Sequence, residues 1–238
     1  MTFIHKIRLD QVADTHRYPF TLPVVQHLLK HPLELKRPIT FLTGDNGAGK
    51  STLVEAIAVA AGFNAEGGTQ SFHFATRATE SSLGDYLILS WGTRKPRTGF
   101  FLRAESFYNV ATEIDRIGQG IHASYGGKSL HERSHGESFI DLMTHRFGSK
   151  GLYVLDEPEA ALSVKGCLTV LRRMHELVEE GSQFIIATHS PLLLAAPNAT
   201  ILEITDTIDE VSYDTAEPVR LTRNFLGEPD RFLKHLLD

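Results

Sequence analysis

The hydropathy pattern alternates between short, uninterrupted apolar runs and segments whose apolar residues recur at helical spacing. The runs cover residues 38–43, 152–155 and 184–188, and their lack of polar alternation is typical of strands buried on both faces of a parallel sheet. The helices between them are predicted over residues 53–61, 137–147 and 163–180. The last of these helices carries an apolar stripe of Val164, Cys167, Leu168, Leu171, Met174 and Val178. This alternation predicts an α/β fold with a parallel core sheet.

The remaining segments predict an antiparallel part of the fold. Residues 1–43 begin with a strand-like alternation and continue as strands and loops interrupted by prolines. Residues 86–91 and 99–104 favour strands, and the polar turn between them predicts an antiparallel hairpin. Further elements are predicted as a helix over 106–117, a loop over 118–133, a strand over 201–204 and a short amphipathic helix over 230–237. We therefore expect one domain over residues 1–238, with an antiparallel and helical excursion at about 65–133.

Composition and charge exclude several classes of protein. The chain of 238 residues is 42% hydrophobic and 22% charged, which is ordinary for a globular domain. Its formal charge of −5 indicates no overall affinity for nucleic acid. The N-terminus has no long apolar core, and no apolar run reaches membrane-spanning length, so we expect a soluble protein without membrane insertion. Cys167, the only cysteine, can form no internal disulfide, which favours a cytoplasmic location.

A glycine-rich motif follows the first of the apolar runs. Residues 44–52 fit the pattern G-x-x-x-x-G-K-[ST], with a strand predicted before them and a helix after them. Such a turn points backbone N–H groups at one place, on the positive end of a helix dipole. Lys50 would add a charge for the β- and γ-phosphates, and the Ser51 hydroxyl would hold Mg²⁺. The expected phosphate-binding residues are Asn46, Gly47, Ala48, Gly49, Lys50, Ser51 and Thr52.

Polar residues also end the two later apolar runs. Asp156 and Glu157 directly follow the run 152–155, and His189 follows the run 184–188. Carboxyl ends of parallel strands lie beside the ligand crevice in open α/β sheets. Asp156 would then share the Mg²⁺ with Ser51, Glu157 would polarise the water that attacks the γ-phosphate, and His189 would contact that phosphate or hold Glu157 in place.

Together these three segments resemble the ATP-binding head of the ABC-type superfamily, which includes SMC-like and RecF-like ATPases and transporter motor domains. The order and rough spacing match over residues 36–195. The resemblance implies a P-loop NTPase fold with a parallel core sheet, an antiparallel β subdomain and a helical segment. It also implies bound ATP and Mg²⁺, with Glu157 as the catalytic base and His189 as the switch histidine.

The resemblance further implies a signature loop, S-G-G-Q in the family, before the strand that ends in Asp156. The corresponding residues are Ser134-His135-Gly136-Glu137, which depart at two positions. Ser134 and Gly136 would press on the γ-phosphate of a second head, so ATP would lie between two heads of a homodimer. The same residues also fit an ordinary capping box that opens the 137–147 helix, and both can hold at once.

The type of head is indicated by residues 156–163. They read D-E-P-E-A-A-L-S, closer to the D-E-P-E-x-x-L form of soluble RecF-like and AAA-type ABC ATPases than to the D-E-P-T-S-A-L-D of transporter motors. About 80 residues separate Ser51 from Ser134, too few for long coiled-coil arms. The family's Mg²⁺-contacting glutamine is assigned to Gln70, with Gln119 as a second candidate. Tyr18 and Phe20 are candidates either for adenine stacking or for the core.

The resulting hypothesis is a homodimeric, Mg²⁺-dependent, cytoplasmic ATPase that works on an unknown protein or nucleic-acid partner. A transporter motor subunit, a nucleotide-dependent regulatory switch with little turnover and a P-loop kinase are the alternatives. Two other features are interpreted as surface: the spacing of His131 and His135, and the basic turn containing Arg94, Lys95 and Arg97.

Overall fold

The computed structural model describes residues 2–10, 15–69, 82–104 and 135–237. Its strands are β1 (Ile4–Leu9), β2 (Leu33–Glu34), β3 (Ile39–Gly44), β4 (Leu87–Trp91), β5 (Thr98–Arg103), β6 (Gly151–Asp156), β7 (Gln183–Ala187), β8 (Ala199–Ile204) and β9 (Ile208–Val211). Its helices are α1 (Pro23–Leu28), α2 (Lys50–Ala60), α3 (Leu83–Tyr86), α6 (His135–Arg146), the 3₁₀ turn η3 (Pro158–Ala161), α7 (Val164–Glu179), α8 (Pro191–Leu194), α9 (Glu217–Gly227) and α10 (Pro229–Leu237). The expected mixed α/β fold is confirmed.

The core sheet has six strands in the order β5-β6-β7-β3-β8-β9. All neighbouring pairs from β5 to β8 are parallel, and only β9 runs antiparallel to its neighbour β8. Since β7 lies between β6 and β3, the three segments that follow these strands emerge at one edge of the sheet. The phosphate-loop motif, the Asp156-Glu157 pair and His189 are these segments.

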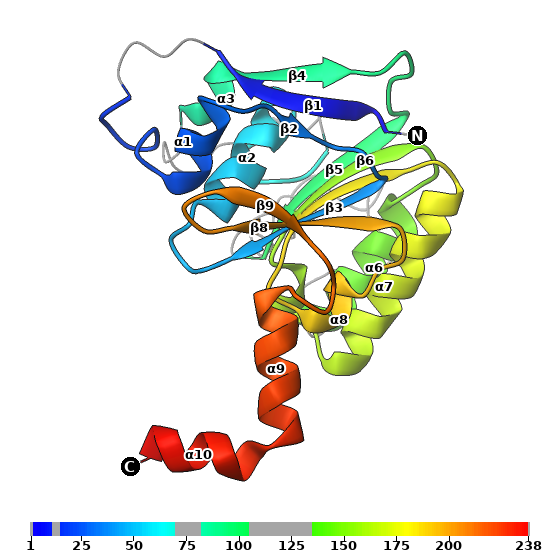
Figure 1. Cartoon of the computed structure of the whole chain (residues 1–238). Coiled ribbons are helices and arrows are strands. Elements are labelled where there is room, and N and C mark those ends of the chain that lie inside the picture. The colour runs from blue at the N-terminus through cyan, green and yellow to red at the C-terminus, as the bar shows by residue number, and fades with distance from the viewer. Residues whose placement is uncertain (1, 11–14, 70–81, 105–134, 238) are drawn as a thin grey trace.

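A second sheet contains three antiparallel strands in the order β2-β1-β4, and all three come from the first half of the chain. Helix α2 packs on β4 of this sheet and on β6 and β7 of the core sheet, so it lies between the two sheets. Helices α6 and α7 pack on each other along the core sheet (Figure 1).

The prediction of an antiparallel hairpin over residues 86–104 is wrong. Its first strand, β4, pairs with β1 in the antiparallel sheet, and its second, β5, pairs in parallel with β6 in the core sheet. The turn between them therefore connects two sheets. The physical reason lies in burial: Phe100, Phe101 and Leu102 are all buried, and a strand that buries both of its faces suits a sheet packed on both sides.

Successive residues of the core strands supply two separate hydrophobic cores. In β6, Leu152 and Val154 belong to the core shared with α2 and the antiparallel sheet, whereas Tyr153 and Leu155 belong to the core under α6 and α7. The same alternation occurs in β7. It follows from the two-residue period of a strand, and it explains why these runs contain no polar alternation.

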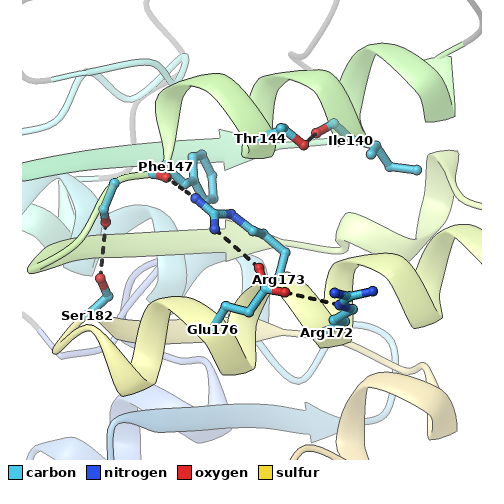
Figure 2. Close-up of polar contacts among 8 residues, drawn as sticks. Ile140, Thr144, Phe147, Arg172, Arg173, Glu176 and Ser182 are labelled. Atoms are coloured by element: carbon cyan, nitrogen blue, oxygen red, sulfur yellow. Dashed lines mark hydrogen bonds and ion pairs between the residues drawn. The ribbon is translucent and has the colours of Figure 1, made fainter.

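The pair α6 and α7 is held by polar as well as apolar contacts. Arg173 of α7 donates a hydrogen bond to the Phe147 carbonyl at 2.9 Å and forms an ion pair with Glu176, and the Ser182 hydroxyl bonds to the carbonyl of Gly148 (Figure 2). Ser163 caps α7 by accepting from the N–H of Gly166. Within α7 the predicted stripe is partly wrong, since Val164 and Leu168 are exposed while Val170 and Leu177 are buried.

Of the other predicted elements, some are confirmed, one segment is corrected, and some lie outside the described residues. The strand at 201–204 and the C-terminal amphipathic helix are confirmed as β8 and α10, and α10 extends away from the body (Figure 1). Residues 1–43 are predicted as strands and loops because of their prolines, but they contain the helix α1. Pro23 is compatible with this helix because it occupies the first turn, where a missing N–H is harmless. The helix at 106–117 and the loop at 118–133 lie outside the described residues. No helix in the described part of the chain is both long enough and apolar enough to cross a bilayer.

The buried side chain of Gln183 joins the two sheets. Its Oε1 accepts from the N–H groups of Phe3 and Ile4 at 2.8 and 2.9 Å, and its Nε2 donates to the Ile4 carbonyl at 2.8 Å. Gln183 begins β7 and Ile4 begins β1, so one amide provides backbone partners that would otherwise be missing at the start of β1.

We expect Gln183→Ala to lower the free energy of unfolding by about 3 kcal/mol, because three buried backbone groups would lose their partners. Urea unfolding followed by circular dichroism measures this loss. Thr169→Ala, which removes one exposed hydrogen bond on α7, is the matched control. Equal losses in the two variants would contradict a joining role for Gln183.

Candidate nucleotide site

The phosphate-loop motif adopts the strand–turn–helix arrangement that its sequence predicts. It follows β3 and leads into α2, whose first residue is Lys50. Gly49 caps the helix with a φ of 93°, and a Cβ at this position would lie 2.7 Å from Cγ1 of Val24, so only glycine fits. The backbone N–H groups in the first turn of an α-helix have no partner within the helix, so the start of α2 is suited to binding an anion.

The Lys50 ammonium is held over the loop. Its Nζ donates to the carbonyls of Gly44 and Asp45, both at 2.8 Å, and the residue is buried. Burial lowers the pKa of Lys50, while the carboxylates of Glu157, Asp156, Asp45 and Glu159 act in the opposite direction and favour its charged form. Lys50 thus lies within electrostatic reach of the carboxylates that follow β6.

The ends of the three central strands lie level with one another. Ala187 of β7 is opposite Leu42 of β3 on one side and opposite Asp156 of β6 on the other. The N–H of Glu157 continues this pattern by donating to the Ala187 carbonyl at 3.0 Å. His189 follows two residues later, and its Nε2 lies 3.9 Å from Oε1 of Glu157. The sequence-predicted residues Lys50, Asp156, Glu157 and His189 are therefore brought together at one edge of the sheet.

Glu157 has an unusual backbone. Its φ of 49° and ψ of 52° place it in the left-handed region, which a residue with a side chain rarely adopts. The conformation occurs at the junction between β6 and η3. Backbone strain of this kind is concentrated at sites where a side chain must be aimed, and here the side chain faces His189.

Glu159 is a contributor to the site that the sequence did not reveal. Its Oε1 accepts from the Thr188 hydroxyl and from the N–H of His189, both at 2.7 Å. A carboxylate on η3, after β6, thus fixes the segment that follows β7. The only sequence signal was an acidic residue in the D-E-P-E stretch, whose partners could not be identified without the fold.

Arg103 and Glu55 are the other unforeseen contributors. Arg103 ends β5 directly opposite Asp156, and its Nη1 lies 2.6 Å from Oε2 of Glu55, while its Nε lies 3.6 Å from Oδ2 of Asp156. Glu55 is four residues after Ser51 on α2, so the two share one face of the helix. The sequence did not reveal this contact because its pattern predicts Arg103 in an antiparallel hairpin, away from the strand that ends in Asp156.

Several predicted residues remain untested or are corrected. Gln70, Gln119 and Ser134 lie outside the described residues. Gly136 lies in the first turn of α6, where a Cβ would come 2.8 Å from the Ala161 carbonyl oxygen, so its backbone packs closely on the end of η3. Phe20 is wrong as an adenine candidate because it is completely buried and packs edge-on against Tyr86. Tyr18 is 65% exposed, with its hydroxyl 3.4 Å from that of Thr52 at the start of α2.

The donor set fits a magnesium ion. Ser51 offers a hydroxyl at the start of α2, and Asp156 offers a carboxylate at the end of β6. Mg²⁺ prefers oxygen ligands and is commonly bound by one or two protein side chains together with phosphate oxygens and water. Ser51 and Asp156 would supply the protein share of such a coordination.

Comparison with known proteins finds two matching family models and several similar ATP-binding proteins. A family model described as "AAA domain" matches residues 25–126, and one described as "AAA domain, putative AbiEii toxin, Type IV TA system" matches residues 138–195. The ribose import ATP-binding protein RbsA of Shigella dysenteriae is 26% identical over 210 residues, which cover 79% of this chain and 42% of that protein. UvrABC system protein A of Agrobacterium fabrum is 26% identical over 142 residues, covering 57% of this chain and 14% of that protein. The chain thus spans less than half the length of these relatives.

Two solved structures are similar at 16% identity. The SMC head domain from Thermotoga maritima matches with a TM-score of 0.47 and covers 88% of this chain and 98% of its own. An inward-facing ABC transporter of metal-chelate type matches with a TM-score of 0.47 and covers 77% of this chain and 75% of its own.

We expect Glu159→Ala to lower the free energy of unfolding by about 2 kcal/mol, because the Thr188 hydroxyl and the N–H of His189 lose a charged acceptor. Glu159→Gln keeps an acceptor oxygen and should lose less. Chemical denaturation measures both. Glu179→Ala, at the exposed end of α7, is the control, and a loss no larger than that of the control would contradict this role.

Proposed function

We propose that the chain is an ABC-type P-loop ATPase head that binds ATP and Mg²⁺ at the carboxyl ends of β3, β6 and β7 and hydrolyses the γ-phosphate, a proposal that the AAA-domain family matches and the similarity to RbsA support. Residues 1–238 act in this proposal as one head domain. The observation that carries it is the convergence of Lys50, Asp156, Glu157 and His189, which come from separate parts of the sequence. Such convergence has no structural purpose in an ordinary loop, since it brings like-charged carboxylates together.

Phosphate binding is assigned to the loop and the start of α2. The backbone N–H groups of residues 46–52 surround the phosphates, and Lys50 supplies a full positive charge. In this assignment Lys50 exchanges carbonyl partners for phosphate oxygens. Ser51 and Asp156 hold the metal, which neutralises charge on the β- and γ-phosphates when bound.

Hydrolysis is assigned to the two residues at the strand ends. In this assignment Glu157 orients and polarises the attacking water. His189, whose Nε2 lies 3.9 Å from Oε1 of Glu157, orients that carboxylate and contacts the γ-phosphate. Glu159 keeps His189 at this distance through the backbone N–H.

The second half of the nucleotide site comes, in this proposal, from a second copy of the chain. Gly136 and Ser134 would complete the partner's site at the N-terminus of α6, where the helix dipole favours an anion. ATP binding then closes two heads, and hydrolysis reopens them. The close packing of Gly136 on η3 supports a mechanical connection between this segment and Glu157.

The work that the head performs is the open part of the proposal. An unidentified protein or nucleic acid is one class of partner. The similarity to RbsA, named as an import ATP-binding protein, favours a transporter motor as the second candidate. The D-E-P-E stretch at residues 156–159 is the feature that favours the first, and copurification with a membrane permease would favour the second.

Replacement of the proposed base separates binding from hydrolysis. Glu157→Gln should retain ATP affinity and lose at least about 100-fold in phosphate release, because the isosteric amide cannot accept the proton of water. With ATP bound it should form a dimer in light scattering after size exclusion. Glu179→Gln is the control variant. Undiminished phosphate release would contradict the role of Glu157, and a monomer with ATP demonstrably bound would contradict closure of two heads.

Adenine stacking is assigned, in this proposal, to the exposed ring of Tyr18. Tyr18→Ala should weaken binding of fluorescent ATP analogues about tenfold, since base stacking on an aromatic side chain contributes about 1–3 kcal/mol. Tyr18→Phe keeps the ring and should bind within about twofold of the unchanged protein. Equal losses in both variants would instead indicate that the hydroxyl contact with Thr52 is what matters.

A further inference from the structure

Arg103 lies beside the carboxylate to which the metal has been assigned. Its guanidinium is 3.6 Å from Asp156 at Nε and 2.6 Å from Glu55 at Nη1, and the Arg103 side chain is only 24% exposed. The side chains of Glu55 and Asp156 are 9% and 8% exposed. One largely buried cation thus compensates two buried carboxylates from different elements, α2 and β6.

This arrangement has a direct electrostatic consequence for a divalent ion. A positive charge close to Asp156 repels a second positive charge at the same carboxylate, and the repulsion is strong where water is largely excluded. Since Glu55 lies on the same face of α2 as Ser51, the guanidinium is held on the side of the helix that carries the proposed metal ligand. The charge of Arg103 therefore acts on the metal position itself.

We propose that Arg103 is a positioning residue that acts as an internal counter-cation, preventing Asp156 from holding a divalent metal until the nucleotide is bound. The inference rests on the proposed function, because it takes Asp156 as the metal ligand. In the nucleotide-free protein Arg103 balances Asp156 and Glu55. The phosphates add negative charge at the start of α2, and this excess makes a divalent ion favourable despite the guanidinium.

Glu55 determines how firmly Arg103 is held away from the metal. Its contact with Arg103 is the shorter of the two, so Arg103 can loosen its hold on Asp156 while it keeps Glu55 as partner. Loss of Glu55 would leave more of the positive charge of Arg103 acting on Asp156. Loss of Arg103 would leave two carboxylates with an excess of negative charge. The two changes therefore predict shifts of metal affinity in opposite directions.

The test measures binding of Mn²⁺, as a probe for Mg²⁺, by electron paramagnetic resonance with and without ATP. In the absence of nucleotide, Arg103→Gln should bind Mn²⁺ at least about tenfold more tightly than the unchanged protein. With ATP at saturation, Glu55→Gln should bind Mn²⁺ at least about threefold more weakly. The double variant Glu55→Gln with Arg103→Gln keeps the net charge and should return to within about threefold of the unchanged protein. Arg172→Gln, which removes an exposed guanidinium paired with Glu176, is the control and should change nothing.

Shifts in the same direction for the two single variants, or no shift in either, would overturn the inference, because a purely structural pair would be damaged in the same way from both sides. If Arg103→Gln does not fold, Glu55→Gln and the double variant still decide, since unchanged Mn²⁺ affinity in Glu55→Gln contradicts the proposal. Failure of the proposed function is distinguishable, because the unchanged protein would then bind no ATP. Normal ATP hydrolysis with unaltered metal affinity in both single variants would reject the role of Arg103 alone.

Discussion

The parallel pairing of β6, β7 and β3 is the constraint on which the rest of the site depends. It sets Ala187 level with Asp156 on one side and with Leu42 on the other, so the three following segments must leave the sheet at one edge. A parallel sheet of this kind is stable only when both faces are covered. Helix α2 and the antiparallel sheet cover one face, and α6 and α7 cover the other, so the strands are stabilised from both sides while the site residues follow their carboxyl ends.

The charged residues at the carboxyl ends of these strands form two partly independent groups. Lys50 lies among carboxylates that oppose the effect of burial on its pKa, and His189 lies beside Glu157. Around this first group, Glu159 fixes the chain after β7 and Arg103 compensates Asp156 and Glu55. Buried carboxylates are costly without partners, so these outer contacts make it possible for a fold to concentrate acids where a divalent metal ion would need them.

The connection between the two sheets is equally specific. Gln183 begins β7 and satisfies the backbone of Phe3 and Ile4, while Gly49 approaches Val24 so closely that a larger residue would not fit. The antiparallel sheet is thus joined to β7, and helix α1 packs against the phosphate loop. A larger residue at Gly49 would therefore disturb how α1 packs on the loop.

The amino-acid sequence by itself determined the strands β3, β6 and β7, the helix α2 and the positions of Lys50, Asp156, Glu157 and His189. These depend on local patterns: an apolar run fixes where a strand ends, and the residue after it occupies the end of that strand. The tertiary structure alone decided the partners. It paired β5 with β6 instead of β4, buried Phe20, and brought Glu159 to His189 and Arg103 to Glu55. Those outcomes depend on which distant strands become neighbours, and this choice is made by burial of whole surfaces, which no short stretch of sequence encodes.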